Sequence, residues 1–312
     1  MNRRDALMLG VASVAEIAAT SSVRALPAAD EAAPATEIIP LWPEGPPDGT
    51  DVAAALRAKN GNSPFTISAD GALTNVADSR LTVFRPSHPD GSAMIVVPGG
   101  GYLRENVDPE GTAIARHFAS FGITSFVLTY RLPGEGWPDR SEVALVDAER
   151  ALSVANVAAQ NFAIDPARIG ILGFSAGGHI ATLLATRGGG RLAFVALGYP
   201  VVTMLKPFAH EASREHLFGG ETGDRTRAAF SCEQLVTSTT PPSFLFAADD
   251  DPDVPVENTL MLHASLRRAR VPVELHLFER GGHGFGLGAT APISAWPDLF
   301  LRWGRSRGFF TG

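Results

Sequence analysis

The segment that most restricts how this chain can fold is a G-x-S-x-G pentapeptide at residues 173–177. An apolar run precedes it at residues 169–172, and a run that suits a helix follows at 180–185. This order predicts a strand that turns sharply into a helix with Ser175 at the tip, a turn known as a nucleophile elbow. The glycines remove side chains that would collide with neighbouring backbone in so tight a turn. An ordinary glycine-rich turn is the alternative interpretation.

Apolar runs typical of buried strands alternate with helical patterns along the chain. The strand-like runs cover residues 81–84, 93–97, 123–129, 169–172, 192–197, 244–248 and 273–278, and the helical ones cover 107–120, 141–162, 256–268 and 295–305. Strands that are apolar throughout are usually covered on both faces, and the intervening helices can supply that cover. We therefore expect an α/β fold with a mostly parallel central sheet flanked by helices.

The composition describes a globular protein and argues against some partners. The chain has 312 residues, of which 45% are hydrophobic, and a formal net charge of −7. A net negative charge argues against nucleic acid and anionic membrane surfaces as partners, because binding them needs clustered Lys and Arg. Cys232 is the only cysteine, which excludes an intrachain disulfide and a thiolate metal cluster. The remaining histidines show no metal-ligand spacing, so we expect neither a metal nor a cofactor.

The N-terminal residues 1–25 have the features of an export signal. Arg3 and Arg4 precede a moderately apolar run at 6–19, and Val23-Arg24-Ala25 resembles a cleavage site. The paired arginines favour a twin-arginine signal, with a plain Sec signal or an amphipathic helix as alternatives. The apolar run is too short for a convincing membrane span. We therefore expect a periplasmic or secreted protein, with residues 26–50 as a linker and N-terminal arm because they are rich in Ala, Pro, Glu and Gly.

A serine hydroxyl needs an adjacent base to act as a nucleophile, and the base needs a carboxylate to fix its tautomer. His283 is the candidate base, because it lies in the glycine-rich segment 281–286 just after the last predicted strand. Asp251 is the candidate acid, because it follows the strand predicted at 244–248. The chain order Ser175, Asp251, His283 is that of α/β hydrolases and differs from the orders in other serine-hydrolase folds.

Three more aspartates crowd the loop of Asp251. Asp249, Asp250 and Asp253 are interpreted as turn formers, helix caps or solvated charges, although one of them remains an alternative acid. A calcium loop is a further alternative for this cluster. It is the weaker one, because the glycine and the terminal glutamate of a calcium loop are not at the required spacing.

A second glycine-rich loop, Pro98 to Tyr102, follows the strand predicted at 93–97. In esterases a His-Gly-Gly-Gly run in this place supplies backbone N–H groups to an oxyanion hole, and here a proline replaces the histidine. We expect donors from Gly100 or Gly101 together with Ala176. A tight turn without a catalytic role is the alternative.

Three aromatic residues flank these loops and are candidates for lining an acyl or sugar pocket. They are Tyr102, Trp137 and Phe285. Packing in the core is at least as good an interpretation of each.

Taken together, these residues resemble the α/β-hydrolase superfamily of esterases and lipases over roughly residues 81–310. The segments 98–102, 130–133, 173–179 and 251–258 are similar to exported bacterial esterases described as acetylxylan-esterase-like or xylanase-like. The resemblance implies an α/β-hydrolase domain at 51–312 with a short cap insertion at 201–240. It also implies a serine esterase that removes acetyl or other short acyl groups from carbohydrate or small-molecule esters.

Two other functions remain open at this point. A serine peptidase of the same fold is one, and it is weaker because no propeller domain is recognisable ahead of the predicted hydrolase region. A non-catalytic binding protein with a hydrolase fold is the other, although such proteins usually lack one of the three site residues that this chain carries. Fold alone does not decide between these functions.

Overall fold

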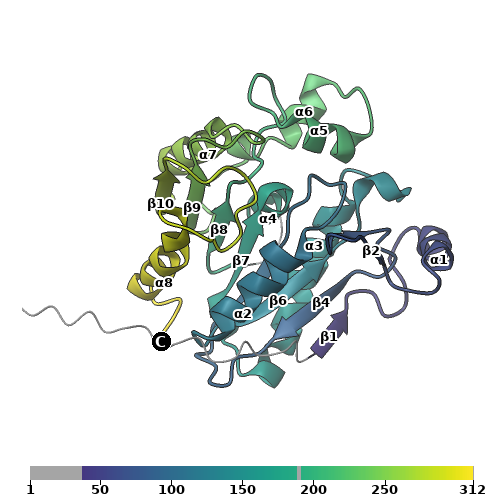
Figure 1. Cartoon of the computed structure of the whole chain (residues 1–312), viewed down its shortest axis with the longest axis horizontal. Helices are drawn as coiled ribbons and strands as arrows, with labels where there is room; N and C mark the ends of the chain where they lie inside the picture. Colours follow the sequence, from purple (N-terminus) through teal and green to yellow (C-terminus); the bar gives the residue numbers. More distant parts are fainter. Residues whose placement is uncertain (1–36, 188–190, 312) are drawn as a thin grey trace, which may run out of the picture.

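The computed structural model describes residues 37–187 and 191–311, so the predicted export signal at 1–25 lies outside the described residues. Eight strands form one sheet in the order β1-β4-β6-β5-β7-β8-β9-β10 (Figure 1). The strands are β1 (Glu37–Pro40), β4 (Arg80–Phe84), β5 (Ala93–Val97), β6 (Thr124–Thr129), β7 (Ile169–Phe174), β8 (Val195–Gly198), β9 (Ser243–Ala248) and β10 (Val273–Phe278). The pairs β1–β4 and β4–β6 are antiparallel, and all other pairs are parallel. The prediction of a mostly parallel sheet is confirmed.

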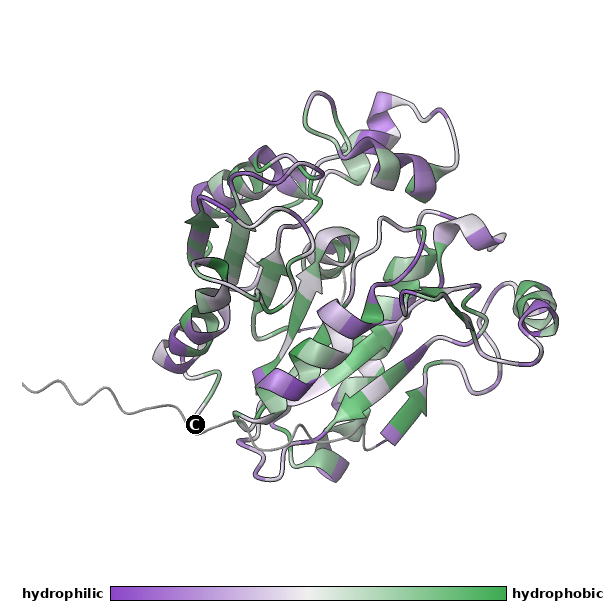
Figure 2. Ribbon diagram, in the orientation of Figure 1, coloured by the Kyte–Doolittle hydropathy of each residue, from purple (hydrophilic) through white to green (hydrophobic). Residues whose placement is uncertain are grey.

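Helices cover both faces of this sheet, and the side chains of β5 show why. Ile95 belongs to one core cluster, which it shares with residues of α3 (Val143–Ala158), α4 (Ser175–Arg187) and α7 (Glu257–Arg268). The flanking Met94 and Val96 belong to the opposite cluster, with α2 (Ala113–Ala119) and α8 (Trp296–Ser306). Successive side chains of a strand point to opposite faces, so an entirely apolar strand requires apolar cover on both. Figure 2 shows the hydrophobic strands between helices of mixed polarity.

The remaining elements are short and surround the sheet. They are the helices α1 (Thr50–Lys59), α5 (Glu211–Phe218) and α6 (Asp224–Ala229), the hairpin β2 (Thr66–Ile67) and β3 (Leu73–Thr74), a π-helical turn η1 (Asp108–Thr112), and the 3₁₀ turns η2 (Pro133–Glu135), η3 (Ala159–Phe162), η4 (Pro166–Arg168), η5 (Cys232–Gln234) and η6 (Ile293–Ala295). Among the described helices, none is long and apolar enough to cross a membrane.

The expected linker at 26–50 needs a correction in its second half, because β1 lies within it and pairs with β4. Leu41 is fully buried, and its backbone N–H donates to the carbonyl of Ser79. The indole N–H of Trp42 donates to Asp147 at 2.8 Å. These contacts attach the segment to the body of the domain. The sequence pattern missed the strand because four residues ending in proline give too short an apolar run.

The parallel strands place their carboxyl ends at one edge of the sheet. The loops after β5, β7, β8, β9 and β10 therefore meet at this edge, which is where open α/β sheets bind ligands. The segment 201–240, expected as a cap, contributes α5 and α6, which lie beyond these strand ends in Figure 1. Asn258 of α7 holds its first part, because its side-chain oxygen accepts the N–H groups of Val202 and Thr203 and its amide donates to Phe208.

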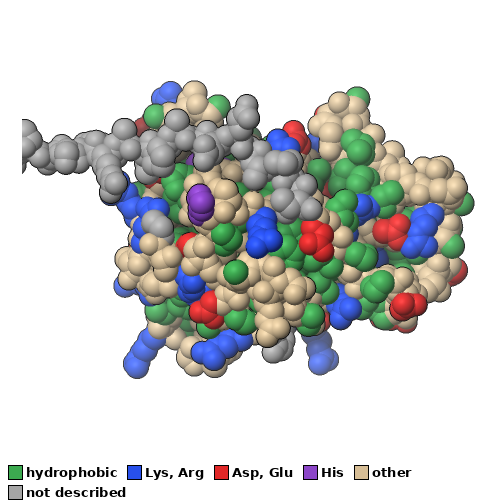
Figure 3. Space-filling model, turned by 90° about the horizontal axis from the view of Figure 1, so that it is seen from below, with side chains coloured by type: hydrophobic (Ala, Val, Ile, Leu, Met, Phe, Trp, Pro, Cys, Tyr) green, Lys and Arg blue, Asp and Glu red, His purple; other side chains and the backbone are tan. Residues whose placement is uncertain are grey.

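Figure 3 views the molecule from below the orientation of Figure 1. On the part of this face that is not covered by grey atoms, Lys and Arg lie among Asp and Glu and form no single basic patch. Such a mixed surface gives no extended positive field for a polyanion.

Candidate functional site

The predicted elbow is formed at the junction of β7 and α4. Ser175 has a φ of 50°, a left-handed conformation that is strained for a residue with a side chain. A side chain at Gly173 would overlap the carbonyl oxygen of Gly177, and one at Gly177 would overlap that of Val97. Both glycines of the pentapeptide are therefore required by close backbone contacts. The turn leaves Ser175 at the carboxyl edge of the sheet.

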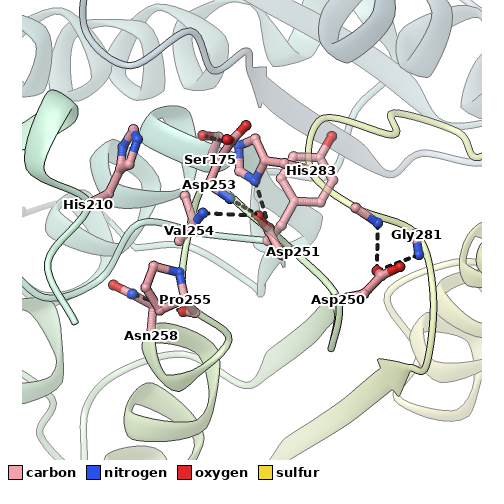
Figure 4. Close-up of polar contacts among 12 residues, drawn as sticks. Ser175, His210, Asp250, Asp251, Asp253, Val254, Pro255, Asn258, Gly281 and His283 are labelled. Carbon is pink, nitrogen blue, oxygen red and sulfur yellow. Dashed lines mark hydrogen bonds and ion pairs between the residues drawn. The ribbon is translucent and has the colours of Figure 1, made fainter. Parts of the chain in front are cut away.

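The structure brings Ser175, His283 and Asp251 together from three separate loops, as Figure 4 shows. The Nε2 of His283 lies 2.8 Å from the hydroxyl oxygen of Ser175, and its Nδ1 lies 2.7 Å from Oδ2 of Asp251. Because an ionised carboxylate only accepts hydrogen bonds, Nδ1 carries the proton that is donated to Asp251. The lone pair of Nε2 then faces the hydroxyl proton of Ser175, which is the arrangement needed for a general base.

Asp251 is distinguished from the neighbouring aspartates by its contacts. Its side chain is 2% exposed, and its Oδ1 accepts the backbone N–H groups of Asp253 and Val254, each at 2.9 Å. Asp250 has a different task, because its Oδ1 accepts the N–H groups of the two glycines just before His283, each at 2.8 Å. Asp250 therefore fixes the loop that carries the histidine. The sequence left Asp250 open as a turn former, a helix cap, a solvated charge or an alternative acid, and did not predict this contact.

The glycine-rich loop after β5 passes directly against the serine. A side-chain carbon at Gly99 would lie 2.8 Å from the Cβ of Ser175. The N–H of Gly99 is bound to the carboxylate of Glu110, whereas the N–H groups of Gly100 and Gly101 have no acceptor within the described ranges 37–187 and 191–311. Ala176 lies in the first turn of α4, where backbone N–H groups have no partner within the helix.

The three aromatic candidates lie in different surroundings. Tyr102 is 1% exposed, and its hydroxyl donates to Nδ1 of His179 at 2.6 Å. Trp137 is buried in a small cluster with Ala53 of α1. Both side chains are almost fully buried, so they pack in the core and present little surface to a ligand. Phe285 is half-buried on the loop of His283.

His210 is a residue of the site that sequence reasoning missed. It immediately precedes α5, and Figure 4 shows it across the site from His283. Its Nδ1 lies 2.7 Å from the hydroxyl of Ser213. Burial lowers the pKa of His210, and the nearby His283 lowers it further. The Nδ1 of His216, on the same helix, lies 2.9 Å from the carbonyl oxygen of Gly101, so α5 packs against the glycine-rich loop. No sequence pattern within 201–240 marked these histidines.

The chain is similar to known hydrolases. A model of the prolyl oligopeptidase family matches residues 134–303. An acetylxylan esterase from Xylanibacter ruminicola is 32% identical over 222 residues, which cover 69% of this chain and 45% of that protein. The endo-1,4-beta-xylanase B of Butyrivibrio fibrisolvens is 32% identical over 216 residues, covering 65% of this chain and 34% of that protein. This chain thus spans less than half the length of these two curated relatives.

A solved structure is similar over nearly the whole chain. The acetyl ester-xyloside bifunctional hydrolase from Caldicellulosiruptor lactoaceticus has a TM-score of 0.73 at 32% identity, covering 90% of this chain and 100% of that one. Its similarity supports the same α/β architecture around the residues described above.

Proposed function

The chain belongs to the prolyl oligopeptidase family of α/β hydrolases, and from this we propose that it is a serine carboxylic-ester hydrolase. One observation carries the proposal: Ser175, His283 and Asp251 form a continuous line of hydrogen bonds at 2.8 and 2.7 Å. A hydroxyl, an imidazole and a buried carboxylate in this order provide a nucleophile, a base and a group that orients the base.

The proposed mechanism follows from the positions of these groups. His283 takes the proton of Ser175 as its oxygen attacks the ester carbonyl, and Asp251 stabilises the imidazolium that forms. The N–H groups of Gly100 or Gly101, with that of Ala176, bind the developing oxyanion. Such a donor typically lowers the barrier by ~3–4 kcal/mol. His283 then protonates the leaving alcohol, and the acyl group remains on the oxygen of Ser175. In the second step His283 activates a water molecule, which attacks this acyl group and releases the acid.

The proposed substrates are acetyl or other short acyl esters of carbohydrates or small molecules. Support comes from the names of the relatives, an acetylxylan esterase and an acetyl ester-xyloside hydrolase. Phe285 is the remaining candidate for a substrate contact, because it lies on the loop of His283.

The protein is proposed to be exported to the periplasm or secreted through a twin-arginine-type signal at 1–25, on the strength of Arg3 and Arg4. Fractionation of cells that express the whole chain tests this. An Arg3→Lys, Arg4→Lys variant retained in the cytoplasm supports the proposal, and equal export of both forms contradicts it.

Hydrolysis of p-nitrophenyl acetate, butyrate and octanoate by the wild type and Ser175→Ala tests the proposed chemistry. We expect cleavage that is fastest with acetate and is lost in the variant, followed by release of acetate from acetylated xylan. Activity that survives in Ser175→Ala contradicts the assignment of the nucleophile. Cleavage of aminoacyl-proline anilides without ester cleavage would favour the peptidase, and inactivity on both classes would favour a binding protein.

A further inference from the structure

A buried carboxylate behind the site, that of Glu110, has both of its oxygens engaged. The side chain is on the π-helical turn η1, and the residue is 1% exposed. Its Oε2 accepts the N–H of Gly99 at 2.8 Å, and its Oε1 accepts the hydroxyl of Tyr199 at 2.9 Å. Gly99 is the glycine that lies against Ser175. One oxygen of Glu110 therefore holds the loop that carries the proposed oxyanion donors.

Tyr199 extends the contact to the loop of the histidine. Its hydroxyl oxygen accepts the backbone N–H of Gly286 at 3.0 Å, so its own proton is directed to Glu110. Its ring stands edge-on to that of His283, with 4.9 Å between the centroids. The N–H of Gly286 thus donates to the hydroxyl of Tyr199, and that hydroxyl donates to the carboxylate of Glu110.

The backbone is in rare conformations at both residues. A π-helical turn presents Glu110, and the next residue, Gly111, has no room for a side chain because it packs on Val127. Tyr199 has a φ of 37°, which is strained for a residue with a side chain. π-helical turns and strained residues occur often at functional sites, where surrounding contacts hold them in place.

We propose that Glu110 and Tyr199 are positioning residues that tie the glycine-rich loop of Gly99 to the loop of His283 and place a negative charge behind the imidazole. This inference rests on the proposed esterase function and deepens it. Both partners of Glu110 donate to it, so the ionised form satisfies every polar atom of the arrangement. That charge favours the imidazolium that His283 becomes as Ser175 loses its proton.

Titratable groups lie around His283 on several elements. Asp251 lies at its Nδ1, Asp250 is on the neighbouring loop, His210 faces it from the cap segment, and Tyr199 with Glu110 lies behind the ring. Of these, Glu110 alone also contacts the loop of Gly99. Burial raises the pKa of Glu110, and its hydrogen bonds and the nearby His283 act in the opposite direction.

The test compares Glu110→Gln with Glu135→Gln in p-nitrophenyl acetate hydrolysis from pH 5 to 9. Glu135 is a matched control, because its carboxylate also accepts two N–H groups, those of Asn75 and Val76, outside the loops of the site. We expect Glu110→Gln to lower kcat by about tenfold or more with KM within about twofold. The acidic limb of its pH profile should move to lower pH, because the imidazolium that forms in catalysis loses a nearby anion. Glu135→Gln should keep the wild-type kcat and profile.

Tyr199→Phe removes only the hydroxyl and keeps the ring beside His283. It should lower kcat by about tenfold, again with little change in KM. If Glu110→Gln does not fold, this variant decides: a loss of that size supports the inference, and wild-type kcat overturns it. The inference also fails if Glu110→Gln loses thermal stability but keeps kcat and its pH profile, or if Glu135→Gln shows the same shift. A wild type without esterase activity would instead contradict the proposed function.

Discussion

At the scale of single residues, Asp251 differs from the aspartates around it in what its oxygens contact. One oxygen accepts from His283 and the other from two backbone N–H groups, so the carboxylate cannot turn without losing a partner. Asp249 and Asp253 are exposed, and neither side chain contacts the histidine within the described part of the chain. The geometry therefore favours Asp251 among the alternatives that the sequence left open.

Asp251→Asn should lower kcat for p-nitrophenyl acetate by about 10³–10⁴-fold, because an amide facing Nδ1 favours the wrong tautomer of His283. Asp253→Asn is the matched control, since Asp253 contributes only its main-chain N–H to Asp251. It should keep kcat within about twofold of the wild type. Equal losses in the two variants would show that general damage to the loop, and not the orienting carboxylate, causes the effect.

Ser175, Asp251 and His283 were predictable because each lies in a short local pattern directly after a strand. Glu110 and Tyr199 were not, because their contact joins positions 89 residues apart, and neither residue stands in a recognisable motif. His210 was missed for a similar reason: its place beside the site depends on how 201–240 folds back over the strand ends.

At the scale of elements, the turn between β7 and α4 is fixed by its contact with the end of β5. A side chain at Gly177 would overlap the carbonyl oxygen of Val97 and come within 2.5 Å of that of Pro98. Both atoms belong to the backbone that leads into the glycine-rich loop. The serine and the proposed oxyanion donors are therefore set relative to each other by one close packing contact.

Gly177→Ala should force these two elements apart. We expect a loss of ~1–3 kcal/mol in the free energy of unfolding, as for other overpacked sites, and about a hundredfold loss of kcat from misplaced groups. Gly220→Ala is the control, because a side-chain carbon there meets no atom within 4 Å. Thermal unfolding and ester hydrolysis measure both effects. A Gly177→Ala enzyme with wild-type kcat would contradict the close contact.

Two strand boundaries were predicted correctly from the sequence. The strands predicted at 93–97 and 273–278 coincide with β5 and β10. The helix predicted at 107–120 begins with a π-helical turn instead, because Gly111 lets the chain pack closely on Val127. Periodicity shows that a helix is present but does not report such local changes in its winding.

At the scale of the whole molecule, His179 joins three segments in the core. It lies on α4, accepts from Tyr102 of the glycine-rich loop, and its Nε2 lies 2.7 Å from the carbonyl oxygen of Phe230 in the cap segment. Burial lowers the pKa of His179 to about 4, whereas the ordinary value is 6.5. The histidine therefore stays neutral in the folded protein over most of the acidic range.

This burial predicts how stability depends on pH. Between pH 6.5 and 4 the unfolded chain takes up a proton at His179 and the folded chain does not, so the free energy of unfolding falls as the pH falls. The difference between these two pKa values corresponds to about 3 kcal/mol in the free energy of unfolding. This stability is fully present above pH 6.5 and is lost as the pH falls toward 4. Buried carboxyls with raised pKa values, such as those of Glu105 and Glu233, change stability in the opposite direction.

Urea unfolding at several pH values isolates the histidine when the wild type is compared with His179→Gln. The variant keeps a donor and an acceptor but no group that titrates in this range. Its free energy of unfolding should depend less steeply on pH between 6.5 and 4. Parallel curves for the two proteins would show that the histidine is not held neutral.

The edges of the sheet have a consequence for how the protein behaves in concentrated solution. One edge is β1, which has four residues and ends in Pro40, so its last position has no N–H to donate. The other is β10, which carries the charged Glu274 and the polar His276, whose side chains contact each other. Short strands, prolines and charges are the features that discourage a strand of another molecule from adding to a sheet. The chain can thus carry a large, apolar central sheet and still resist edge-to-edge aggregation.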